Sequence, residues 1–143
     1  NYKMSDILAA LGLIQLTKVE KLIEDRINKA KYYMELLSNV DGIRPPLTKP
    51  NTRHTFQSFV CFVEKKGARD KLRKKLAEKG IETQIGTYAL HLEPAFRNVK
   101  RVGDLRVSEQ LFNNLITLPL HYELTQEQQE LACKIIHEEL QVN

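Results

Sequence analysis

The feature that most constrains this fold is a segment near the start of the chain, residues 7–16, that is apolar on nearly every side of a helix. Its large apolar side chains, which cover almost the whole circumference, are Ile7, Leu8, Leu11, Leu13, Ile14 and Leu16. A helix that is apolar all round needs to be buried on all sides. A domain of 143 residues has few ways to surround its own first helix, so we expect another protein surface to cover this segment.

The same helix is expected to continue to about Ser38. Ser5 is a favourable N-cap, and Asp6 suits the positive end of the helix dipole. Apolar residues then recur at steps of three and four, which is the spacing of an amphipathic helix: Val19, Ile23, Ile27, Ala30, Met34 and Leu37. We therefore expect residues 1–39 to form one long helical segment that leads into the domain.

Three further segments are expected to be strands. Residues 55–63 (TFQSFVCFV) are rich in aromatic and β-branched types and apolar on both faces, which is typical of a central, buried strand. Residues 81–85 alternate between apolar and polar, as in a half-buried strand. Residues 116–120 (ITLPL) form a short strand that Pro119 ends.

Two helices are expected in the second half of the chain. One begins near Asp104, and its apolar face consists of Val107, Leu111, Phe112 and Leu115. The other follows Thr125, which forms a capping box with Gln128. The inner residues of this last helix include Leu131, Ile135 and Leu140. With few and short strands among these helices, we expect one α+β domain over residues 1–143, a small sheet covered by helices.

All of the excess positive charge lies on residues 64–79, EKKGARDKLRKKLAEK. This stretch holds eight Lys or Arg and three Asp or Glu, whereas the rest of the chain holds fourteen basic and fifteen acidic groups. Ala68, Leu72 and Leu76 form an apolar helical stripe, and Gly80 is a C-cap. We interpret the basic face as solvated, because aromatic residues do not interleave the charges; a nucleic-acid-binding patch is the alternative.

The cysteines and the hydropathy favour a cytoplasmic protein. Cys61 and Cys133 lie in apolar segments without a CxxC or metal-binding spacing, as expected of buried, reduced thiols. No apolar run approaches the length of a membrane span. We therefore expect neither a metal site nor a membrane partner.

Few residues suggest chemistry by themselves. His91 is the most interesting histidine, because it lies in a long irregular stretch, and loops on a rigid scaffold often carry function. A loop histidine bonded to a nearby carbonyl is the alternative. No nucleophile elbow, P-loop, dinucleotide fingerprint or metalloprotease motif is present. The residues taken one by one therefore indicate no enzyme.

Three motifs together resemble the DegT/StrS-type sugar aminotransferases. The opening NYKMSDILAALGLIQL is similar to the family stretch NYRMSDLQAALGLAQL. IETQIGTYALHLEPAF is similar to the family segment I-T-x-x-x-Y-x-x-LH-x-x-PAY, and LITLPLHYELTQEQQE to the ending ILSLPLYPELTEEQ. The motifs occur in the family order and span nearly the whole chain.

The resemblance implies the small domain of a fold-type-I aminotransferase, with a mainly antiparallel sheet. Such enzymes are homodimers that transfer an amino group, usually from glutamate, to a nucleotide-linked keto-sugar through pyridoxal phosphate (PLP). The family's Schiff-base lysine lies in a large domain that precedes the first motif. We therefore expect this chain to lack the PLP-binding domain and to be inactive alone.

The resemblance also implies four site residues. The asparagine of the first motif contacts the cofactor phosphate of the partner subunit, a role that falls on Asn1. The family arginine is replaced by Lys3, which lacks the bidentate fork. His91 matches the histidine that lines the sugar-nucleotide side of the cleft, and Tyr88 is a weaker match because Gly86 and Thr87 replace the commoner HYP form.

Two other functions remain open at this point. The basic segment fits a regulatory or nucleic-acid-binding domain, and the apolar segment at 7–16 fits a stand-alone dimerisation module. The resemblance implies no nucleic-acid partner.

Overall fold

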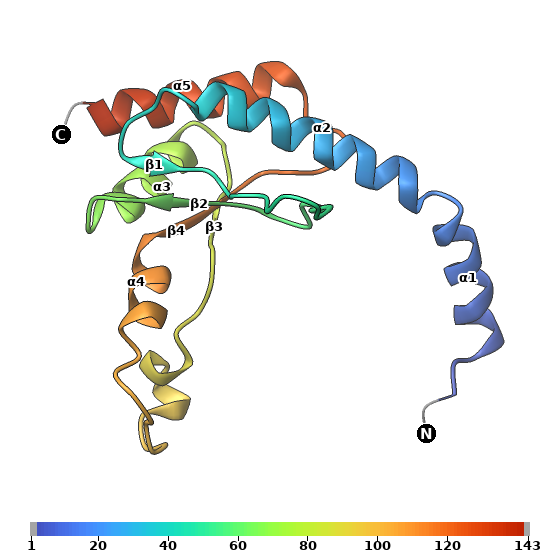
Figure 1. Cartoon of the computed structure of the whole chain (residues 1–143), viewed down its shortest axis with the longest axis horizontal. Coiled ribbons are helices and arrows are strands. Elements are labelled where there is room, and N and C mark those ends of the chain that lie inside the picture. The colour runs from blue at the N-terminus through green and yellow to red at the C-terminus, as the bar shows by residue number, and fades with distance from the viewer. Residues whose placement is uncertain (1–2, 142–143) are drawn as a thin grey trace.

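The structure, a computed structural model, describes residues 3–141 and confirms an α+β fold (Figure 1). Within these residues the helices are α1 (Asp6–Leu16), α2 (Val19–Leu37), α3 (Ala68–Glu78), α4 (Arg106–Asn114) and α5 (Gln126–Gln141), with two 3₁₀ turns, η1 (Leu90–Leu92) and η2 (Pro94–Phe96). The strands are β1 (Ile43–Arg44), β2 (Phe59–Val63), β3 (Gln84–Ile85) and β4 (Leu115–Leu118). They form one antiparallel sheet in the order β1-β2-β4-β3.

The core lies between the sheet and a layer of helices, α2, α3 and α5. In β2 every second residue is fully buried, and Phe59 stacks on Tyr33 of α2 with ring centroids 5.0 Å apart. The helices and β4 supply most of the other core side chains: Leu37, Leu72, Leu76, Ile116, Leu118, Cys133 and Ile136. Both cysteines are buried and unpaired, as the sequence predicted.

The predicted long helix is two helices, α1 and α2, and this expectation was wrong. The Thr17 hydroxyl donates to the carbonyl of Ile14 over 2.8 Å, and the Lys18 amide donates to Gln15 over 3.0 Å in a three-residue step. This tightened turn stops the α-helical ladder, and α2 leaves in a different direction (Figure 1). The predicted cap at Ser5 is confirmed, because its side chain accepts from the Leu8 amide at 3.4 Å.

The strands are shorter than predicted, and side chains bind backbone carbonyls beside two of them. Phe56 has a φ of +47°, outside the extended region, and β2 begins only beyond it, at Phe59. Arg26 of α2 donates to the carbonyls of Phe56, Gln57 and Leu120 over 3.0–3.2 Å. Arg73 likewise binds the carbonyl of Thr83, and β3 is restricted to Gln84–Ile85.

Two side chains that were expected to face the core are exposed. Val107 of α4 is 67% exposed and Leu131 of α5 is 46% exposed. The buried stripe of α5 runs through Ala132, Cys133 and Ile136, and Leu131 stands one residue away from it, on the outer side. The predicted capping box is confirmed: the Thr125 amide donates to Gln128 Oε1 at 3.0 Å, and the Gln128 amide donates to Thr125 Oγ1 at 3.3 Å.

Candidate functional site

Tyr88 and His91 lie in an arm, residues 86–114, which comprises the irregular segment after β3 together with α4. The arm projects away from the sheet on the side opposite to α2 and α5 (Figure 1). Its starting point is fixed by a close approach at Gly86. A Cβ atom there would stand 2.4 Å from Leu115 Cβ and 2.6 Å from Val60 Cγ1, so a side chain does not fit. Gly86 therefore lets the arm leave the sheet directly beside β4.

His91 is held inside the arm by two separate contacts. Its Nε2 lies 3.0 Å from Oε1 of Glu109, and its side chain is only 11% exposed. Arg101 Nη2 donates to the His91 carbonyl at 2.8 Å. The histidine thus pairs with a carboxylate from α4 rather than with the nearby carbonyl that the alternative interpretation supposed.

Tyr88 is arranged differently from His91. Its side chain is 63% exposed, and its ring lies 6.5 Å from that of Phe112 on α4, centroid to centroid. The neighbouring Ala89 is buried and anchors this part of the arm. The structure therefore brings Tyr88 and His91 onto one short segment, with the tyrosine largely exposed and the histidine ring mostly covered.

The remaining two predicted site residues are at the other end of the molecule. Asn1 lies outside the described residues. Lys3 is exposed and precedes α1, which Figure 1 shows far from the arm. Within one chain the structure therefore does not bring Lys3 to His91.

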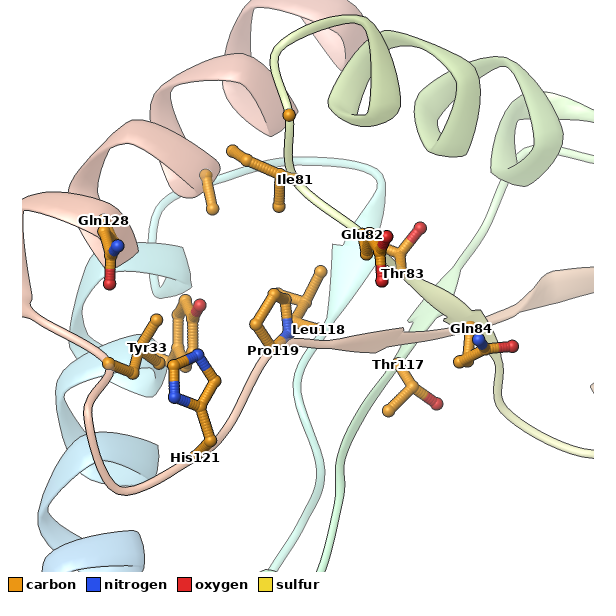
Figure 2. A pocket seen from close by; sticks show the side chains of 13 residues that line it. Tyr33, Ile81, Glu82, Thr83, Gln84, Thr117, Leu118, Pro119, His121 and Gln128 are labelled. Atoms are coloured by element: carbon orange, nitrogen blue, oxygen red, sulfur yellow. The ribbon is translucent and has the colours of Figure 1, made fainter.

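A pocket of about 450 Å³ lies between the start of α5, the end of β4 and β3 (Figure 2). Tyr33, His121 and Gln128 line it, but neither Tyr88 nor His91 does. The Tyr33 hydroxyl is buried and has no hydrogen-bond partner among residues 3–141, and burial raises the pKa of this phenol above its ordinary value. The lining of this pocket contains no Lys or Arg, so the pocket does not suit the phosphates of a nucleotide.

A second pocket, of about 490 Å³, lies at the start of α3. It is lined by Lys65, Lys66 and Lys71, with three acidic residues and no aromatic side chain. A PLP site needs a lysine for the Schiff base and a partner for the pyridine ring. The pocket at Tyr33 has an aromatic wall without a lysine, and this one has lysines without an aromatic wall. Neither of these two pockets fits PLP, and we assign no catalytic step through PLP to the residues of this chain.

Two arginines of the basic helix α3 point toward the body of the domain and bind backbone carbonyls there. Arg69 is 4% exposed and donates to the Leu115 carbonyl at 3.0 Å, and Arg73 binds the Thr83 carbonyl. The sequence did not distinguish these two arginines from the solvated lysines. Their role is structural, which weakens the nucleic-acid alternative.

Metal and membrane features are absent from the described part of the chain. Residues 3–141 contain no group of three or more His, Cys, Asp or Glu that could hold a metal ion. None of their helices is long and apolar enough to span a membrane.

Comparison with known proteins decides the family. The profile of the DegT/DnrJ/EryC1/StrS aminotransferase family matches residues 1–137. The chain belongs to this family. It is 28% identical over 141 residues to the dTDP-4-amino-4,6-dideoxy-D-glucose transaminase of Shigella dysenteriae, covering 96% of this chain and 38% of that protein.

Two further similarities extend the comparison. The chain is 30% identical over 132 residues to the GDP-perosamine synthase of Caulobacter vibrioides, covering 88% of this chain and 34% of that protein. Its fold matches Spr1654 of Streptococcus pneumoniae, named as a sugar aminotransferase, with a TM-score of 0.85 and 26% identity over 98% of this chain and 36% of that one. The chain spans about a third of the length of the curated relatives that it matches.

Proposed function

We propose that this chain is the small domain of a cytoplasmic, PLP-dependent aminotransferase that transfers an amino group from glutamate to a nucleotide-linked keto-sugar. The family match over residues 1–137 is the observation that carries the proposal. The relatives' names support the substrate class, since they include aminotransferases of dTDP-linked and GDP-linked sugars. Spr1654, which shares the fold, has been solved in PMP and PLP forms.

In this proposal the arm binds and orients the sugar-nucleotide. His91 provides a ring nitrogen held in a fixed direction, and the largely exposed Tyr88 provides a hydroxyl on the same segment. Both groups form directional hydrogen bonds of the kind that hydroxyl-rich ligands and phosphates accept. PLP, when bound in the large domain, supplies the electron sink for the amino transfer.

The opposite end of the chain serves a partner subunit in this proposal. Asn1 donates amide N–H groups to the phosphate of the partner's cofactor, and Lys3 adds a positive charge near it. The separation of α1 from the arm in Figure 1 supports this division, because one chain does not close a site from both ends.

The exposed apolar surface of α1 supports a proposed contact with a partner subunit and with a large domain. No residue of α1 is buried, and Ile7, Leu13 and Leu16 are 83%, 65% and 66% exposed. A helix with such a surface needs cover from elsewhere. We propose that the large domain and the partner subunit together provide it.

The proposal is tested by steady-state kinetics of the parent enzyme with His91→Ala. We expect a higher KM for the sugar-nucleotide or a lower kcat, and an unchanged KM for the amino donor, because the lost contact is to the sugar-nucleotide alone. His137→Ala on α5 is the matched control and should behave as wild type. Unchanged constants for His91→Ala would remove this residue from the site.

The proposed inactivity of the chain alone has a separate test. The chain is mixed with PLP and reduced with borohydride, which fixes any Schiff base, and the products are mapped by mass spectrometry. We expect only scattered, substoichiometric labelling of exposed lysines. Stoichiometric labelling of one lysine would contradict the proposal.

A further inference from the structure

We propose that Glu109 is a positioning residue that fixes the imidazole of His91 and leaves Nδ1 as the ring atom that meets the substrate. The contact that carries this proposal is the 3.0 Å approach of His91 Nε2 to Glu109 Oε1. The substrate role of Nδ1 rests on the proposed function, whereas the fixing of the ring by Glu109 does not.

The chemistry of the pair decides which nitrogen carries hydrogen. An ionised carboxylate only accepts hydrogen bonds, so Nε2 has to be the donor. This holds whether the imidazole is neutral or protonated. A neutral His91 then has Nδ1 as an acceptor for a hydroxyl or N–H group, and a protonated His91 has Nδ1 as a donor for a phosphate oxygen.

Nδ1 is open to a ligand in this arrangement. It has no hydrogen-bond partner among residues 3–141. It is also absent from the set of fully buried polar atoms without a partner, so solvent reaches it. The side chain is 11% exposed, so most of the ring is covered, while Nδ1 is not fully buried. A fixed ring with one accessible nitrogen binds a ligand at a lower entropic cost than a mobile one.

Different residues of the arm hold the ring of His91 and its backbone. Glu109 extends from α4, and its own amide donates to the Leu105 carbonyl at 3.1 Å within the first turn of that helix. Arg101 binds the backbone carbonyl of His91, and the η1 turn is closed by the Leu92 amide on Ala89 at 2.8 Å. Removing Glu109 should therefore release the ring and leave the η1 backbone in place.

A spectroscopic experiment tests the fixed ring on this chain. In ¹⁵N-edited NMR of the imidazole groups, we expect a slowly exchanging Hε2 resonance for His91, because Glu109 holds this proton. Glu109→Ala should abolish it. Asp104→Asn, which removes a carboxylate of the same arm that binds Arg106 instead, should retain it. The absence of the resonance in the wild-type chain, or its survival in Glu109→Ala, would overturn the proposal.

A double-mutant cycle in the parent enzyme tests whether Glu109 acts through His91. We expect Glu109→Ala to lower kcat/KM for the sugar-nucleotide by about tenfold, in line with the loss of one hydrogen bond to a charged group. In a His91→Ala background, the same change should cost less than about twofold. An equal cost in both backgrounds would show that Glu109 acts independently of His91 and would contradict the proposal.

The two experiments separate the two levels of inference. Unchanged kinetic constants for His91→Ala, together with the expected Hε2 resonance in the wild-type chain, would reject the substrate role of His91. They would keep Glu109 as the residue that fixes the ring. A missing Hε2 signal with an impaired His91→Ala enzyme would reject the role of Glu109 and keep the proposed site.

Discussion

At the scale of single residues, the unpartnered hydroxyl of Tyr33 has a measurable consequence. This hydroxyl is buried, and its ring packs against Phe59. An unsatisfied buried polar group costs about 1–3 kcal/mol, so Tyr33→Phe should leave the free energy of unfolding unchanged or raise it by up to about 2 kcal/mol. Urea denaturation measures the change. Tyr32→Phe is the control, because it removes a hydroxyl that does have a hydrogen-bond partner, Glu130. A loss of 1 kcal/mol or more on Tyr33→Phe would show that the hydroxyl has a partner in solution.

The two thiols provide a prediction about pH. Burial raises the pKa of Cys133 to about 12, from an ordinary value of 9.0, and raises that of Cys61 as well. Above pH 9 the unfolded chain therefore loses thiol protons that the folded chain keeps, so stability should fall as the pH rises from about 9 towards 12. At pH 8 neither thiol should react with Ellman's reagent until urea is added. Rapid labelling of the folded chain would contradict this.

At the scale of elements, two glycines form a matched pair. Gly86 has no room for a Cβ, whereas Gly12 on exposed α1 has no atom within 4 Å of that position. Gly86→Ala should destabilise the fold by about 1–3 kcal/mol, because the arm has to move away from Leu115. Gly12→Ala should raise the helical signal in circular dichroism, since alanine is favoured over glycine by about 1 kcal/mol in a helix. Equal stability of the two variants would show that the arm shifts freely.

Sequence patterns predicted two helix caps whose causes are local. The capping box of Thr125 and Gln128 and the cap at Ser5 depend on residues three positions apart, and both were found as expected. The boundary between α1 and α2 also rests on local contacts, those of Thr17 and Lys18 with residues three positions earlier, but no apolar spacing marks it. The contacts beside the strands, in contrast, involve distant partners. Arg26 binds the carbonyls of Phe56 and Gln57 just before β2, thirty or more positions away in the sequence. No periodicity in the strand itself contains that information.

The candidate site shows the same limit. His91 was identified from its loop and from a motif, but Glu109 was missed because eighteen positions separate it from the histidine. Only the return of α4 alongside the irregular segment of the arm brings the two side chains together. A carboxylate on a helix has many solvent-facing explanations, and the sequence offered no reason to choose this one.

At the scale of the whole molecule, α1 determines how the isolated chain behaves in solution. Its apolar side chains extend all round the helix, and this chain covers none of them fully, which agrees with the expectation from residues 7–16. The rest of the chain has a well-filled core of its own. We therefore expect the isolated chain to be folded and to self-associate through the exposed apolar surface of α1.

Sedimentation velocity at several concentrations checks this expectation. The weight-average mass should exceed the monomer value of 16.6 kDa and rise with concentration, because association covers the exposed apolar surface. Ile7→Glu together with Leu13→Glu should restore the monomer, since charged side chains on α1 resist burial. Leu131→Glu, at an exposed position on α5, is the matched control and should associate like wild type. A wild-type chain that remains monomeric at every concentration would show that α1 needs no cover, and it would remove the support that this helix lends to the proposed homodimer.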